Sequence, residues 1–235
     1  MRHYRKCLLS LILTASIFSG LFVCRASAAE FLAAERFDDK ITNSVSVGGT
    51  EISGGTAKVV RVGKENKALL SEKSASAVQI KTPFSATENE YIFTAKLMPA
   101  SAERVTLKLG ISVGADFVPV VYIVSGSVMT AEGKRLASLA ASDFTELSVH
   151  VNRRAQVCDI YINKKLAAKG WRADGLSAEP GGVCIVKASL SGGVYIDDIA
   201  AYSGADISRT LAPVRLNAAV TDDIYIDPDP GDFTY

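Results

Sequence analysis

Two adjacent aspartates near the end of the sequence are the residues most suggestive of chemistry. Asp197 and Asp198 lie in the stretch VYIDDIAAY, where apolar and polar residues alternate as they do in a β-strand. Neighbouring side chains of a strand point to opposite faces of the sheet. We therefore expect that the two carboxylates do not act on one substrate from one side, which disfavours a paired general acid and base.

The stretch GISVG, residues 110–114, matches the G-x-S-x-G pattern of serine hydrolases. That nucleophile requires a strand, a tight turn and then a helix, whereas Ser112 is followed by β-branched residues and Pro119. The base would have to be His150, which lies in the strand-like stretch SVHVN. The sequence therefore argues against a serine hydrolase, and we interpret His150 as a surface or half-buried strand residue.

The sequence lacks the residues of other common catalytic and metal sites. Zinc sites use clustered Cys and His, but the chain offers His150 and two separated cysteines beyond its N-terminal segment. The glycine-rich GGTEISGG lacks the Lys-Ser/Thr of a phosphate-binding loop. We find no catalytic motif, and we expect a protein that is not an enzyme.

Trp171 is the one tryptophan, in the stretch AAKGWRADG, which we interpret as a loop. An exposed aromatic ring there could stack on a sugar, with Arg172 and Asp174 reaching its hydroxyls. The alternative is a ring that anchors the loop against the edge of the core, because burial of so large a side chain is strongly stabilising. The strand tyrosines 122, 161 and 195 could line a binding face or an ordinary sheet surface.

The elements that must position these residues are β-strands. Short runs of β-branched and aromatic residues recur about every 10 residues between Gly, Pro, Asn and Asp turns, as in a sandwich or barrel. The pair TELSVHVN and QVCDIYIN predicts a hairpin with a strict period of two, followed by a turn at residues 163–165. The fold class that we predict is all-β, with two antiparallel sheets.

The hairpin, its continuation CDIYINKKLAAKG and the closing GGVYIDDIAAYSG resemble the end of secreted bacterial domains of the concanavalin A-like, laminin G-like jelly-roll superfamily. AAERFDDKITNS resembles their first edge strand, which pairs near the final strand. The resemblance covers roughly residues 30–204 and implies two sheets packed face to face, one of them concave. Relatives that cleave β-glucans carry a Glu-x-Asp-x-x-Glu motif, which this chain lacks.

The resemblance also implies a candidate calcium site. If the first and last strands pair, Asp38 and Asp197 approach each other at the sheet edge, with Asp39 beside them. Ca²⁺ binds six to eight hard oxygen ligands, so Asp38 and Asp197 are the candidate metal ligands. Aspartates that are solvated or bonded to a turn are the alternative.

The first 28 residues read as a secretory signal peptide. Arg2, Arg5 and Lys6 precede an apolar run, and Ala26-Ser27-Ala28 forms a small-x-small cleavage site. An uncleaved membrane anchor is the main alternative, and a lipoprotein processed at Cys24 is less consistent with the bulky Val23. We expect a chain that is secreted or held at the cell surface, and that meets a membrane only through its leader.

Charge and cysteine content fit a secreted or surface-held chain. Cleavage removes four basic residues and no acids from 26 Lys and Arg and 25 Asp and Glu, which leaves a net charge of −3. Such a chain has no basic excess for nucleic acid. Cys158 and Cys184 remain, either paired in an oxidising compartment or as two buried thiols on neighbouring strands.

The sequence therefore predicts a signal peptide (residues 1–28), a β-sandwich domain (29–204) and an acidic C-terminal tail (205–235). The function that we expect is non-catalytic recognition of a glycan or another extracellular polymer, through the concave sheet, its loops and Trp171. A spacer domain of the cell envelope is the alternative. A glycan-active hydrolase or lyase without familiar motifs is a third.

Overall fold

The structure, a computed structural model, describes residues 30–203, apart from residues 39, 41, 44–48, 65 and 102–103. The predicted signal peptide and C-terminal tail lie outside this part of the chain. Over the described residues all regular structure is β-strand, and no helix there is long and apolar enough to cross a membrane.

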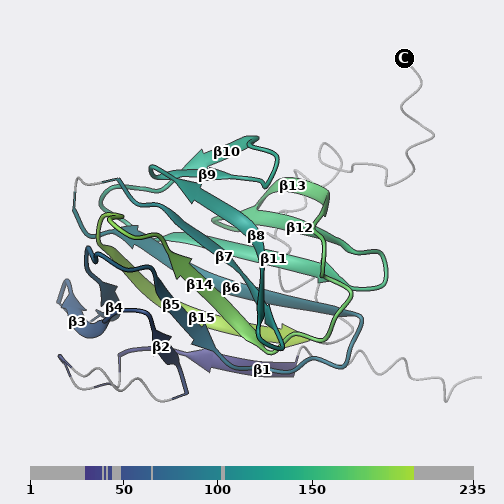
Figure 1. Cartoon of the computed structure of the whole chain (residues 1–235), viewed down its shortest axis with the longest axis horizontal. Coiled ribbons are helices and arrows are strands. Elements are labelled where there is room, and N and C mark those ends of the chain that lie inside the picture. Colours follow the sequence, from purple (N-terminus) through teal and green to yellow (C-terminus); the bar gives the residue numbers. More distant parts are fainter. Residues whose placement is uncertain are drawn as a thin grey trace, which may run out of the picture.

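Fifteen strands in the described part form two antiparallel sheets that lie over one another as layers (Figure 1). The larger sheet has the order β13-β12-β11-β6-β15-β4-β3, and β1 also pairs with β15. Its strands are β13 (Lys165–Arg172), β12 (Val157–Ile162), β11 (Thr145–Asn152), β6 (Glu90–Pro99), β15 (Val194–Ser203), β4 (Asn66–Ser71), β3 (Lys58–Val62) and β1 (Glu30–Glu35).

The smaller sheet has the order β10-β9-β8-β7-β14-β5-β2. Its strands are β10 (Arg135–Ser138), β9 (Ser127–Met129), β8 (Asp116–Val124), β7 (Leu107–Val113), β14 (Gly182–Lys187), β5 (Val78–Thr82) and β2 (Glu51–Ser53). The predicted fold class, an all-β sandwich of two antiparallel sheets, is confirmed.

The predicted hairpin is β11 and β12. Val149 pairs with Ile160 and Val151 with Cys158, and all four side chains are buried between the sheets. The hairpin to β13 then turns at Asn163 and Lys164, which both have positive φ, as a type I′ turn requires.

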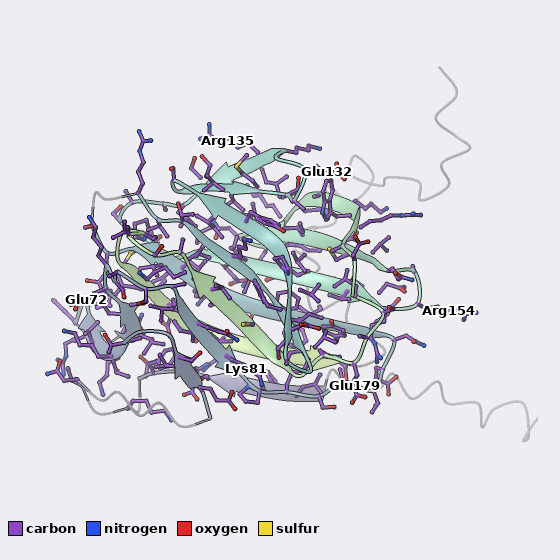
Figure 2. All side chains as sticks on the ribbon, viewed as in Figure 1. Glu72, Lys81, Glu132, Arg135, Arg154 and Glu179 are labelled. Atoms are coloured by element: carbon purple, nitrogen blue, oxygen red, sulfur yellow. The ribbon has the colours of Figure 1, made fainter. Side chains whose placement is uncertain are left out.

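Charged side chains such as Glu72, Glu132 and Arg154 lie at the periphery (Figure 2).

Strand β15 occupies the centre of the larger sheet and has two partners on one of its edges. Along one side it pairs with β6 for most of its length. Along the other side, its first residues 194–196 pair with β4, and residues 199–203 pair with β1. The expectation that the first strand pairs with the last is therefore met, and the two aspartates fall where one partner replaces the other.

The two glycines of GISVG have structural roles. Gly110 lies at a bulge opposite Pro119, so close to the Val118 carbonyl of β8 that a Cβ would clash with that backbone. Gly114 has a φ of 57° in the turn to β8. Ser112 is buried within β7 of the smaller sheet, whereas His150 lies in β11 of the larger one. The two glycines of GISVG are therefore explained by the tight hairpin of β7 and β8.

The two cysteines are free buried thiols. They lie on different sheets, Cys158 on β12 and Cys184 on β14, and not on neighbouring strands as the reduced alternative supposed. Burial raises the pKa of Cys158 to about 12 and that of Cys184 to about 11. Both thiols therefore stay protonated and unreactive near neutral pH.

Lys187 is a charged residue inside the sandwich. It ends β14 on the same face as Val183 and Ile185, it has no exposed surface, and its Nζ has no hydrogen-bond partner. Lys187 is the last residue of β14, and the chain then continues to β15, which begins at Val194. Burial lowers the pKa of Lys187, because desolvation disfavours the charged ammonium.

We expect Gly110→Ala to lower the free energy of unfolding by roughly 1–3 kcal/mol, because its methyl group meets the backbone of β8. Denaturant titration of residues 29–235 checks this. Gly49→Ala is the matched control, since an added methyl there meets nothing within 4 Å. Equal stability of the two variants would contradict the close approach of β7 and β8.

We expect Lys187→Met to raise the free energy of unfolding at neutral pH by roughly 1–3 kcal/mol, because it removes a buried polar group without a partner. The native pKa lies below the ordinary 10.5, so the unfolded chain binds more protons and the wild type gains stability as the pH rises toward that value. The difference in the free energy of unfolding between the variant and the wild type should therefore become smaller at alkaline pH, as measured by denaturant titration. Lys165→Met, on exposed β13, is the control. A destabilised Lys187→Met at neutral pH would contradict this account.

Candidate functional site

A β-bulge places both aspartates of VYIDDIAAY on the outer face of the larger sheet. Asp197 pairs with Lys96 and Ala200 with Thr94, so three steps along β15 match two along β6. Asp198 is the extra residue, with a φ of 44°. The expectation that the two carboxylates point to opposite faces is therefore wrong, because the bulge shifts the alternation by one residue.

Two cations, one on β6 and one just after β1, neutralise the Asp198 carboxylate. Lys96 Nζ, on β6, donates to Asp198 Oδ2 at 2.6 Å, and Arg36 Nε, just after β1, lies 3.4 Å from Asp198 Oδ1. The hydrogen bond to Asp198 raises the pKa of Lys96, against the opposing effect of burial. Arg36 is exposed, so its ion pair adds little stability, but it places a guanidinium beside the bulge.

Asp197 and Asp38 join β15 and the segment after β1 to β4. Asp197 is only 4% exposed, and its carboxylate accepts hydrogen bonds from Asn66 Nδ2 at 3.1 Å and the Asp198 backbone N–H at 2.8 Å. Burial raises the pKa of Asp197, and these two bonds oppose the shift. Asp38 Oδ1 accepts from the Lys67 backbone N–H at 3.0 Å.

The described residues at this edge give no support for a calcium ion, and Asp39, which was expected beside them, lies outside the described residues. Asp38 and Asp197 do line one cavity, as the sequence suggested. However, the carboxylate oxygens of Asp197 and Asp198 are engaged by protein donors, and Lys96 supplies the local positive charge. Over the described residues, no group of three or more acidic, His or Cys side chains could hold a metal ion. The predicted calcium site gains no support from this geometry.

Two hollows adjoin the bulge on the outer face of the larger sheet. The first, the acidic cavity, has a volume of about 570 Å³ and is lined by Arg36, Asp38, Asn66, Lys96, Asp143, Phe144, Glu146, Asn163, Lys164, Asp197 and Asp198. The second, the trough, has a volume of about 300 Å³ and is lined by Phe31, Ala34, Arg36, Thr94, Lys96, Glu146, Lys164, Asp198, Ile199, Ala200 and Tyr202. They share the charged residues Arg36, Lys96, Glu146, Lys164 and Asp198, so they form one continuous surface.

The trough has an aromatic side that pairing of the first and last strands creates. Phe31 of β1 pairs with Tyr202 of β15, and their ring centroids lie 6.0 Å apart at 52°. The Phe31 side chain is 73% exposed. Burial, together with the smaller effect of the nearby Glu146 carboxylate, raises the pKa of Tyr202 to about 12. A large apolar ring therefore stands in solvent beside a charged wall.

The residues predicted to bind a ligand lie elsewhere. Trp171 belongs to β13 and not to a loop; it pairs with Cys158, and its half-buried ring packs against the core. Arg172 and Asp174 are exposed, and none of the three lines the acidic cavity or the trough. The alternative of a core anchor thus fits Trp171, and a binding role for the three residues stays a prediction that this geometry does not favour.

Sequence reasoning missed Phe31, Tyr202 and Glu146. Of the strand tyrosines it considered, Tyr161 lies with Tyr202 against Ile92 on the outer face of the larger sheet. Tyr122 lies on β8 of the other sheet, where Lys108 Nζ is 5.4 Å from its ring centroid. The one available signal was the expected pairing of the first and last strands, which carry Phe31 and Tyr202.

We expect the melting temperature of residues 29–235 to be the same in calcium and in EDTA, because protein donors already bond the carboxylates of the predicted ligands, Asp197 and Asp38. Thermal unfolding with each additive checks this, with magnesium as the control for ionic strength. A rise of several degrees with calcium alone, lost in Asp38→Asn, would restore the predicted calcium site.

Comparison with known proteins supports the fold. No protein-family model matches the sequence, and no curated protein matches it. Among solved structures, a sialidase superposes with a TM-score of 0.57 and 11% identity over 76% of this chain, which spans 19% of the sialidase. The globular domain of T. cruzi calreticulin superposes with a TM-score of 0.52 and 12% identity, over 83% of this chain and 93% of that one. At these identities the likeness is one of fold, and it agrees with a jelly-roll β-sandwich.

Proposed function

We propose that this chain is an exported, non-catalytic module of the concanavalin A-like superfamily that binds a glycan in the trough. The observation that carries the proposal is the composition of the trough: an aromatic pair, the exposed Phe31 and the half-buried Tyr202, faces charged side chains across small floor residues. Export rests on the predicted signal peptide.

The two sides of the trough match the two surfaces of a sugar ring. A sugar presents an apolar C–H face, which packs against an aromatic ring, and a rim of hydroxyls that need hydrogen-bond partners. Phe31 and Tyr202 supply the apolar surface. The floor contains Ala34, Thr94 and Ala200, whose small side chains leave room for a ring.

Glu146 is the polar residue best placed to hold hydroxyls. It lines both the trough and the acidic cavity, and its carboxylate forms none of the ion pairs found in the described residues. Its side-chain contact is a long one, 3.5 Å from the Ser148 hydroxyl. A carboxylate with free lone pairs can accept from two neighbouring hydroxyls, and Lys96 and Lys164 can donate to the ligand's oxygens.

We expect the mature chain to bind one or more of cellulose, xylan, mannan, galactan, arabinan and chitin, and Phe31→Ala to weaken that binding roughly tenfold, about 1.4 kcal/mol. Retention on the immobilised polymers and titration calorimetry with soluble fragments check this. Leu190→Ala is the matched control, because Leu190 is 70% exposed and lies outside the trough and the acidic cavity.

Two further variants locate the site. Glu146→Gln should weaken binding, whereas Glu132→Gln, a peripheral glutamate (Figure 2), should leave it unchanged. Trp171→Ala should lower the melting temperature, because the ring packs on the core, while the folded protein keeps its affinity. Loss of binding in folded Trp171→Ala, with Phe31→Ala unaffected, would return the site to Trp171. No binding to any polymer would favour a spacer domain.

A further inference from the structure

A third hollow lies on the same face of the larger sheet, beyond the trough. It has a volume of about 260 Å³ and is lined by Glu90, His150, Asn152, Val157, Cys158, Asp159, Lys169 and Gly170. We call it the histidine hollow. A bulge in β13 shapes it: Gly170 has a φ of 62°, and its backbone N–H donates to Asp159 Oδ1 at 2.6 Å.

The histidine hollow carries polar groups suited to hydroxyl ligands. His150 Nε2 is buried and has no hydrogen-bond partner, and it lies 3.6 Å from Glu90 Oε2. Asn152 Nδ2 donates to Glu90 Oε1 at 2.8 Å, which holds that carboxylate in place. Lys169 is exposed at the rim. The hollow thus offers hydrogen-bond donors and acceptors to a ligand.

An apolar cluster lies between the histidine hollow and the trough. Ile92 points outward from the sheet between His150 and Tyr202 in register, yet it has no exposed surface, because Tyr161 and Tyr202 pack against it. Two tyrosine side chains therefore lie between the two hollows, and sugar rings can pack against such side chains.

We infer that the glycan site extends from the trough across Tyr202 and Tyr161 to the histidine hollow, and that it takes an unbranched oligosaccharide of several units; this rests on the proposed function. On β6 the two hollows are marked by Thr94 and Glu90, and on β11 by Glu146 and His150. Four residues of extended strand span roughly 13 Å. A single sugar ring is much shorter, so only a chain of linked units contacts both hollows.

The test measures how affinity depends on chain length. Soluble oligosaccharides of two to six units, from each polymer that the mature chain retains, are titrated by calorimetry. Affinity should rise by about tenfold or more between two units and about four and then level off. Lys169→Ala and His150→Gln should weaken binding of the long oligosaccharides several-fold and leave the disaccharides unchanged.

Lys165→Ala is the matched control, because Lys165 is an exposed lysine of the same strand that does not line the histidine hollow. Equal affinity for disaccharides and hexasaccharides, with Lys169→Ala unaffected, would overturn the extended site and leave the trough intact. A loss in Lys169→Ala that is equal at every length would also overturn it, since the hollow would then be part of the primary site. No binding to any sugar would overturn the proposed function together with this inference.

Discussion

The bulge at Asp197 and Asp198 is the constraint on which the larger sheet depends. β15 is a central strand. β6 pairs along one of its edges, and β4 and then β1 pair along the other. A regular strand with a period of two would turn Asp198 toward the core, where an unpaired carboxylate is costly. One extra residue in a left-handed conformation keeps both carboxylates outside and lets Ile199 point into the core.

The surface chemistry of this face follows from that geometry. With both carboxylates outside, Arg36 and Lys96 gather around Asp198, and Asn66 bonds to Asp197. The same junction brings β1 alongside β15, so that Phe31 meets Tyr202. The charged side and the aromatic side of the trough therefore both arise at the bulge, where β1 replaces β4 as the partner of β15.

The outer face of the larger sheet is divided into polar hollows and an apolar middle. Glu146 and Lys96 lie on one side, His150 and Glu90 on the other, and tyrosine side chains pack against Ile92 between them. Burial of Ile92 beneath these rings stabilises their arrangement, because each ring covers apolar surface that water would otherwise contact. A surface arranged in advance needs little reorganisation to bind, which lowers the entropic cost of association.

The sequence by itself determined the strands whose patterns are local. Residues 90–99 and 145–152, the β11–β12 hairpin and the turn at Asn163 could be predicted, because a period of two and turn residues specify them without distant partners. Only the tertiary structure decided which face the acidic pair occupies, and where Trp171 and Phe31 lie. The outcomes for the acidic pair and Phe31 depend on contacts between segments more than 100 residues apart, such as Phe31 with Tyr202 and Asn66 with Asp197. They also depend on a one-residue bulge that reverses the faces of the residues after it. No local pattern encodes these contacts, because the energy that selects them arises only when the sheets are assembled.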